Sequence, residues 1–246
     1  VLLDLGWTHE DVAREIGRDP RWVARRARLT MLTAKWRAEL EKSDSPLHKA
    51  PLANLERIAS LEADIQGRIW DQNCKTLAYS FVVCDSPSGC EAEIVSEYTR
   101  LLTKVPWDVD DETLDPPAGS CLVCLKRTGQ QPLLWDNAER SENGQLHKGE
   151  RCLDPVCFAR REGLCAAREA LRLADLGKPT VVQLGYKQKL PKEVKRRLAE
   201  GGVEVISDRA ATFKEANPSD RGARAVITPG RKTVTWAKVK KTATPP

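Results

Sequence analysis

The chain has 246 residues, of which 41% are hydrophobic, 30% are charged and 5% are aromatic. This composition supplies enough apolar side chains for one large core or two to three small cores. The longest uncharged stretches, Thr76 to Cys84 and Pro116 to Leu125, are shorter than the roughly 20 residues of a membrane-spanning helix. The first residues of the sequence do not show a cationic start followed by an apolar core and a small-residue cleavage site. We therefore expect a cytoplasmic protein without a membrane partner, and we expect the sequence, which opens at Val1, to begin inside a longer protein.

The net charge of +5 is unevenly distributed. Residues 1–50 carry 10 basic and 8 acidic side chains, residues 51–177 carry 14 and 21, and residues 178–246 carry 16 and 6. A polyanion would therefore be held by local patches. The densest patch has one acid, Asp19, among five arginines: Arg18, Arg21, Arg25, Arg26 and Arg28. A solvated helix face is one interpretation, but guanidinium groups favour contacts with phosphate and guanine edges.

Two short helices are predicted near the N-terminus. Thr8 can cap a helix over His9–Ile16, which Gly17 ends because glycine adopts the left-handed conformation at low cost. Asp19, followed by a proline, then begins a second helix over 20–29. A turn of three residues therefore joins two helices.

The spacing of small and apolar residues indicates a helix-turn-helix. Ala13 lets the helices approach, Gly17 turns the chain, and Val23 fills the core between them. An ordinary helical hairpin is the alternative. An indole at Trp22 is as often packed against a following helix as exposed, so both placements stay open. We expect DNA contacts from Thr8, Arg18, Arg21, Trp22, Arg25, Arg26 and Arg28.

These residues carry a resemblance to a known family. The segments Gly6-Trp7-Thr8, Asp19-Pro20-Arg21-Trp22-Val23 and Arg25-Arg26-Ala27-Arg28-Leu29 resemble the central domain of ParB-type partition proteins. Residues 32–40, 51–56 and 58–61 resemble the helices that brace the helix-turn-helix in that family. The similarity covers about residues 1–75, which we assign to a DNA-binding domain.

The resemblance implies a function and partners. A member of this family binds double-stranded DNA at a centromere-like or operator site, forms a homodimer, works with a partition ATPase and is associated with the nucleoid or a plasmid. Residues 1–246 do not include the family's N-terminal domain, which holds the CTP pocket. Any CTPase activity would belong to that missing domain.

A connector is predicted over residues 76–117. It begins as a helical segment and ends in Pro106–Pro117, which contains five acids and three prolines. Such a composition is typical of a linker or a loop that follows the surface. We expect a domain boundary here.

Four of the eight cysteines have the spacing of a metal site. Cys121 and Cys124 form a C-x-x-C knuckle, and Cys152 and Cys157 follow after 27 intervening residues. Asp154 caps a helix that begins at the next residue and runs to about position 176, so Cys157 lies in its first turn. The sequence therefore predicts a structural zinc ion in a four-cysteine module over 118–177.

Three alternatives compete with zinc: disulfides, a redox C-x-x-C and four unrelated buried thiols. His147 is the only plausible substitute ligand. The segments Pro117–Cys121, Lys126–Gln130 and Cys152–Phe158 resemble a module that follows the helix-turn-helix in ParB-like proteins of mobile elements, although Leu125 stands where that family has a proline. The other cysteines are expected to be ordinary buried or free residues: Cys74, Cys84, Cys90 and Cys165.

Residues 178–246 predict a small basic α/β subdomain. A strand over 181–184, a helix over 191–200 and a strand over 203–206 form a β-α-β unit, and 225–227 pairs with 233–236 as a hairpin. We expect Ser207 to Arg224 and Thr242 to Pro246 to be poorly ordered. The excess of basic residues indicates either a sequence-independent contact with nucleic acid or a charged solubilising surface.

The predicted fold is therefore mainly α with a smaller α/β part. The predicted function is site-specific DNA binding in partition or in regulation of a mobile element. No catalytic motif is present, so we do not expect an enzyme. Two alternatives remain: a ParB-like, metal-dependent nuclease using the acids of 108–115, and a transcriptional repressor or protein-interaction module without a partition role.

Overall fold

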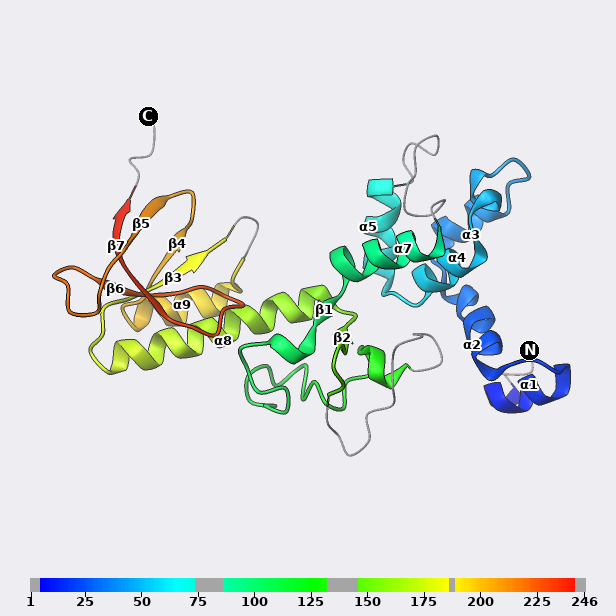
Figure 1. The fold of residues 1–246 in the computed structure, drawn as a ribbon, viewed down its shortest axis with the longest axis horizontal. Coiled ribbons are helices and arrows are strands. Elements are labelled where there is room, and N and C mark those ends of the chain that lie inside the picture. The colour runs from blue at the N-terminus through cyan, green and yellow to red at the C-terminus, as the bar shows by residue number, and fades with distance from the viewer. Residues whose placement is uncertain (1–4, 74–85, 132–145, 186–188, 242–246) are drawn as a thin grey trace. The chain divides into compact units, whose positions relative to one another are not determined.

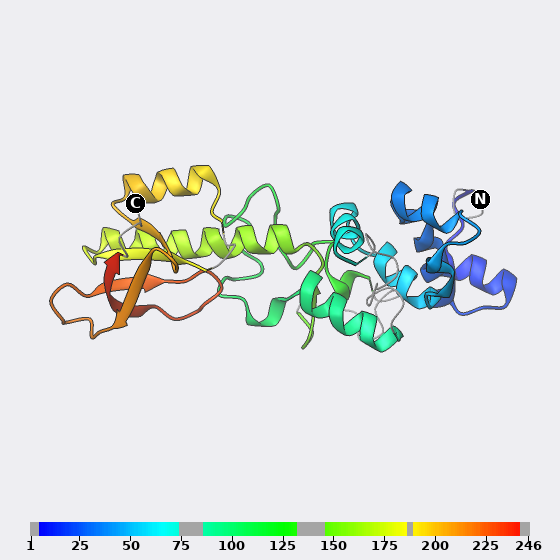
Figure 2. The same cartoon turned by 90° about the horizontal axis from the view of Figure 1, so that it is seen from above.

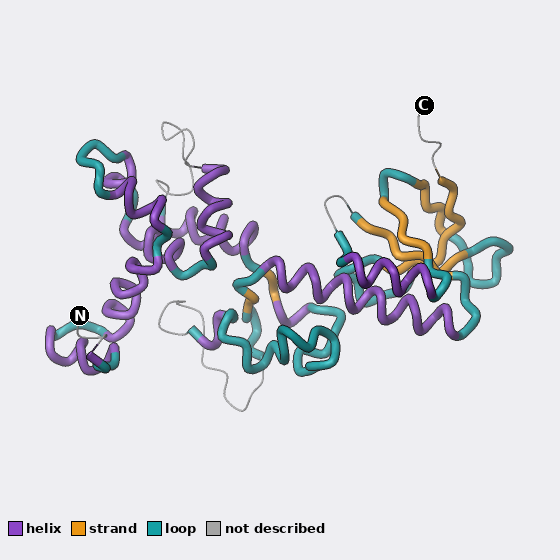
Figure 3. The backbone as a smooth tube through the Cα atoms, turned by 180° about the vertical axis from the view of Figure 1, so that it is seen from behind, coloured by secondary structure: helices purple, strands orange, loops and turns teal. Residues whose placement is uncertain are grey.

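The computed structural model describes residues 5–73, 86–131, 146–185 and 189–241 (Figure 1). Its contacts divide the chain into two units, which we describe separately. The first comprises Val1–Thr103 and Leu125–Pro155, and the second comprises Lys104–Cys124 and Val156–Pro246. The chain is a mixed α/β protein, and in its described part the strands belong to the second unit apart from one short pair (Figure 3). No described helix has the length and apolarity needed to cross a bilayer.

The first two helices lie where the sequence predicts them: α1 is His9–Ile16 and α2 is Pro20–Arg28. Thr8 and Asp11 form a reciprocal cap on α1, in which each side chain accepts a hydrogen bond of 3.1 Å from the other's backbone N–H. Gly17 ends α1 with a φ of 65°, a conformation that costs other residues energy. The Asp19 carboxylate accepts a 2.7 Å bond from the backbone N–H of Arg21 and so caps α2.

The remaining helices of the first unit enclose its main core. They are α3 (Ala34–Leu40), α4 (Leu52–Ala59), α5 (Ala63–Asn73) and α7 (Pro87–Glu93), with a π-helical turn over Ile94–Tyr98 and 3-10 turns at Leu29–Met31, Pro46–Lys49, Leu102–Lys104 and Thr128–Gln130. Trp36 and Trp70 meet edge to face at 5.0 Å in this core. Gln66 is buried, and its side chain bonds the backbone of Met31, Leu61 and Thr33. The packing of α3 against α5 therefore leaves this buried amide satisfied.

A buried ion pair holds the last part of the first unit. β1 (Arg100–Leu101) pairs antiparallel with β2 (Arg151–Cys152). Just before β2, the Glu150 carboxylate accepts a hydrogen bond from Arg127, and both side chains are almost completely buried. A Cβ atom at Gly129 would overlap that carboxylate. This glycine is therefore required for close approach.

The second unit contains a five-stranded sheet in the order β4-β3-β6-β7-β5. Its elements are α8 (Pro155–Asp175), β3 (Thr180–Leu184), α9 (Lys192–Glu200), β4 (Glu204–Ser207), β5 (Ala211–Glu215), β6 (Arg224–Ile227) and β7 (Thr235–Lys241). β3 runs parallel to β4 and β6, whereas β7 is antiparallel to β6 and β5. The predicted β-α-β unit, the hairpin and the start of α8 at Pro155 are confirmed.

The expectation that Ser207 to Arg224 is poorly ordered is wrong. This segment contains β5, all of whose residues pair with β7 from Ala211 opposite Lys241 to Glu215 opposite Ala237. The strand has only two apolar residues, so its local pattern is too short to predict a strand, and the partner that orders it lies 22 to 30 residues away. The predicted tail from Thr242 lies outside the described residues.

Two apolar layers lie on the two faces of this sheet. The helices α8 and α9 cover one face of the sheet (Figures 1 and 2). On that face, Val182 of β3 and Ile227 of β6 pack with Ala170 and Leu198 of the helices. On the other face, a smaller cluster joins Val181, Ile206, Ala211, Val226 and Ala237. Consecutive residues of each strand alternate between these faces, as the pleat requires.

Candidate nucleic-acid interface

The α1–α2 pair has a small core of its own. Val12, Ala13 and Val23 form a cluster of buried residues separate from the main core of the first unit. Val23 is 5% exposed, so its predicted place between the helices is confirmed. Val23 and Ala24 are the buried residues of α2, whereas Arg21 and Trp22, which precede them, are exposed.

The N-terminal end of α2 carries an exposed group of basic and aromatic side chains. Arg18, Arg21 and Trp22 are exposed. The guanidinium carbons of Arg18 and Arg26 lie 5.6 and 5.1 Å from the centroid of the Trp22 ring. These are cation–π distances. Of the two placements left open for Trp22, the structure therefore has the exposed one, with two arginines in contact with its ring.

Arg26 also contacts the brace of the motif. Its guanidinium lies 3.0 Å from the carboxylate of Glu56 on α4. Arg25 is half-buried and lines a small hollow with Ala53, Glu56 and Arg57. Glu56 is not predicted by the sequence, because an ion pair across 30 residues has no local signal. The pair fixes the position of α2 against α4.

The predicted DNA-contacting residues therefore fall into two groups. Thr8, Arg18, Arg21 and Trp22 are exposed, whereas Arg25, Arg26 and Arg28 are half-buried along the later turns of α2. The hydroxyl of Thr8 is used in the cap, where it donates to Asp11 at 2.6 Å. These hydrogen bonds from Thr8 hold the pKa of the Asp11 carboxyl below its ordinary value. The exposed side chains are therefore the ones of this motif that are most accessible to a ligand.

Three of the predicted zinc ligands belong to the second unit. Cys121, Cys124 and Cys157 are half-buried, and none of them forms a disulfide within the described residues. Burial raises the pKa of the Cys121 thiol; the positive charge of Arg161 opposes this shift, while Cys124 and Cys157 add to it. The backbone N–H of Cys124 donates to the carbonyl of Cys121 at 3.4 Å, so the C-x-x-C turn is formed.

Cys152 belongs to the first unit. It is buried at the end of β2, and its sulfur accepts a 3.4 Å bond from the backbone N–H of Asp154. The backbone N–H of His147, the substitute ligand considered above, donates to Glu150. Within the described ranges, no three His, Cys, Asp or Glu side chains are grouped closely enough to hold a metal ion. The donor chemistry suits zinc, but the assembled centre is not present, so zinc binding stays a prediction.

Of the four cysteines that are not predicted zinc ligands, the structure describes two, Cys90 and Cys165. Cys90 is buried in the main core of the first unit, and Cys165 is a half-buried free thiol that donates to the carbonyl of Pro106. Burial raises the pKa of Cys165. Cys74 and Cys84 lie outside the described residues.

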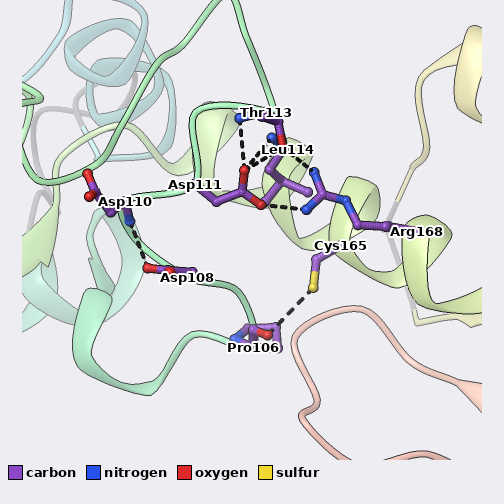
Figure 4. A network of polar contacts seen from close by, with 8 residues as sticks. All are labelled: Pro106, Asp108, Asp110, Asp111, Thr113, Leu114, Cys165 and Arg168. Atoms are coloured by element: carbon purple, nitrogen blue, oxygen red, sulfur yellow. Dashed lines mark hydrogen bonds and ion pairs between the residues drawn. The ribbon is translucent and has the colours of Figure 1, made fainter.

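The acidic segment Pro106–Pro117 is irregular, as predicted, and packs on α8. Trp107 meets Phe158 at 5.1 Å. Figure 4 shows Asp111 facing Arg168, and the same carboxylate accepts bonds from Thr113. Two neighbouring acids are also engaged, because Asp110 accepts from Ser120 and Asp115 pairs with Arg160. The carboxylates of Asp111 and Asp115 therefore hold this loop against α8.

Comparison of the chain with family models, curated proteins and solved structures finds no match. The proposed function therefore depends on the geometry of the chain and on the resemblance described from its sequence. Its best-defined feature is the exposed group at the start of α2.

Proposed function

We propose that this protein binds double-stranded DNA through α1 and α2, with α2 lying in the major groove. The observation that carries the proposal is the exposure of Arg18, Arg21 and Trp22 at the N-terminal end of a helix whose inward residue, Val23, is fixed in a core. A recognition helix places its first residues nearest the bases. The resemblance to ParB-type proteins supports the same role, in partition or in regulation of a mobile element.

Arginine chemistry gives each exposed side chain a specific task. Arg21 lies in the first turn of α2, the part of a recognition helix that is nearest the bases. Its guanidinium group has the geometry to donate to both acceptors on the edge of a guanine. Arg18 lies in the turn before α2, where the helix dipole and free backbone N–H groups also favour a phosphate. Trp22 contacts both Arg18 and Arg26 and limits their rotamers. A partly ordered guanidinium loses less entropy on binding DNA.

Arg26 has a positioning role in this proposal. Its contacts with Glu56 and Trp22 hold its guanidinium group against the protein. Its substitution should therefore weaken binding to all DNA sequences by loosening α2, whereas substitution of Arg21 should remove discrimination.

We also propose a structural zinc ion bound by Cys121, Cys124, Cys152 and Cys157. The supporting observations are that all four are free cysteines and that the C-x-x-C turn of Cys121 and Cys124 is formed. Zinc binds thiolates tetrahedrally and would add folding energy to the segments that carry them.

Selection of bound sequences from a random pool of DNA duplexes tests the main proposal. A homodimer that recognises an operator or centromere-like site should enrich a palindrome with half-sites about one helical turn apart. Enrichment of no motif would contradict site-specific binding. Incubation with plasmid and magnesium tests the nuclease alternative, which requires nicking that Asp110→Asn and Asp111→Asn abolish.

A further inference from the structure

The outer part of the sheet carries lysines in register. β5 and β7 pair so that Lys214 lies directly opposite Lys238 and Thr212 opposite Lys240. All four side chains are exposed. Residues two apart on a strand share a face and lie about 7 Å from each other. Lys214, Lys238 and Lys240, which we name the lysine ladder, therefore project from one face of the sheet.

The two faces of these strands differ in charge. The lysine ladder continues the face that α8 and α9 cover further along the sheet, because Trp236 of β7 packs with that core. On the other face, the positive charges of Lys241 and Arg224 are balanced by an acid, because both side chains form ion pairs with Glu204. Glu215, opposite Ala237, also belongs to that other face. Within the described part of the chain, no acidic side chain forms an ion pair with the lysine ladder.

Protection of a sheet edge is one explanation for these lysines, but it does not require Lys214 and Lys238 to lie directly opposite each other. Lysine on an edge strand discourages pairing with other chains, and β5 is an edge strand. β7 pairs with β6 only through Thr235–Ala237, so Lys238 and Lys240 also lie where the other edge of β7 is unpaired within the described residues. Like charges directly opposite each other destabilise a sheet. An uncompensated cross-strand pair is favoured when an anionic partner supplies the missing charge.

We propose that the lysine ladder is a second DNA-binding surface, which contacts the phosphates of double-stranded DNA without sequence preference. A phosphate backbone is an anionic partner that repeats along its length and so can neutralise several lysines at once. Lysine contacts phosphate as a point charge, which suits binding without base discrimination. This surface lies in a different unit from α2. The proposal therefore does not depend on whether α2 recognises bases.

The aromatic residues argue against a single-stranded partner. Proteins that bind single strands stack bases on exposed aromatic rings. The aromatic residue on the face of the lysine ladder, Trp236, is half-buried against the helix-side core, and Phe213 packs with the opposite face. Within the described residues of β5 and β7, no other aromatic side chain is present.

Binding of the full chain to a random-sequence duplex of about 30 base pairs tests this proposal. The test variant is Lys214→Gln/Lys238→Gln/Lys240→Gln. The matched control is Lys178→Gln/Lys192→Gln/Lys195→Gln, which removes the same charge from exposed positions of the same unit. The plot of log affinity against log salt has a negative slope, and each lost phosphate contact reduces the magnitude of that slope by about 0.9. We therefore expect the magnitude to fall by roughly 2 to 3 in the test variant. The control should keep the wild-type slope.

Two further measurements separate the proposal from its alternatives. Replacement of the lysine ladder by arginine should keep random-duplex affinity within about twofold, because charge is retained. Lys214→Glu should lower affinity without lowering the melting temperature, because it converts the cross-strand pair with Lys238 into an attractive one. Equal salt slopes in the test and control variants would overturn the proposal. So would a test variant that loses binding to phosphatidylserine vesicles while keeping its affinity for DNA.

Discussion

Arg26 of α2 and Glu56 of α4 lie 3.0 Å apart and form the ion pair that ties the proposed recognition helix to the rest of the first unit. The Glu56 side chain is only 10% exposed, so its charge needs a partner. The cluster of Val12, Ala13 and Val23 supplies the only separate apolar core of α1 and α2 within the described residues. This pair therefore adds a polar contact between α2 and α4 to the packing of Leu29, the C-cap of α2, against the main core.

A double-mutant cycle on Arg26→Ala and Glu56→Ala should give a coupling free energy of about 1 kcal/mol, measured by urea unfolding. The matched control is the pair Lys35 and Asp71, which are 3.3 Å apart and 53% exposed on both sides. Solvent screens that pair, so its coupling should stay below about 0.5 kcal/mol. Equal coupling in both pairs would refute the bracing role of Glu56.

Val23→Asp should unfold α1 and α2 while leaving the main core intact, because it places a charge between helices that share a three-residue core. Hydrogen exchange should show loss of protection over residues 9–28 and retention over α4 and α5. Glu15→Ala, at an exposed position of α1, is the control and should keep protection. Loss of protection throughout the first unit would mean that the α1–α2 pair is not an independent unit of stability.

The acidic loop should make stability depend on pH. Hydrogen bonds from Thr113 and then Arg168 lower the pKa of Asp111 to about 2. A carboxyl with a lowered folded-state pKa stabilises the protein above its unfolded pKa of about 3.9, and this contribution is lost as the pH falls toward 2. Asp111→Asn should therefore lower the melting temperature at pH 7, with a difference that shrinks below pH 4. Glu112→Gln, exposed in the same loop, should show no such pH-dependent difference.

Zinc content should be about one ion per chain, measured by elemental analysis of protein purified without chelator. Cys121→Ser or Cys152→Ser should lower it and destabilise the fold, because a structural metal contributes folding energy. Cys165→Ser should leave the zinc content unchanged. A folded wild-type chain without zinc would show that these thiols serve another purpose.

Local structure was predictable wherever a single residue determines the backbone conformation of the residues next to it. Thr8, Gly17 and Asp19 set the ends of α1 and α2 through a cap, a left-handed turn and a second cap, and all three act within four residues. Pro155 likewise marks the start of α8. Inward placement of Val23 followed from helical spacing.

Long-range partners were not predictable from the sequence. Glu56 meets Arg26 across 30 residues, and Glu150 meets Arg127 across 23. The K-R-T-G sequence resembles part of a metal knuckle, yet the structure uses its arginine in that buried pair. β5 has too few apolar residues for its own sequence to predict a strand, and its structure depends on pairing with β7. Pairing energy of this kind comes from tertiary contacts, which a local pattern does not contain.

The central claim is that the first turn of α2 reads DNA bases. Salt titrations of wild type, Arg21→Ala and Arg28→Ala, each on the selected duplex and on a scrambled one, test it most directly. We predict that Arg21→Ala loses about 1 to 3 kcal/mol on the selected duplex alone, as expected for a lost guanine contact. Arg28→Ala, at the far end of the helix, should weaken both duplexes equally. If both variants lose the same factor on both duplexes, the arginines of α2 form a nonspecific phosphate patch and the claim is wrong.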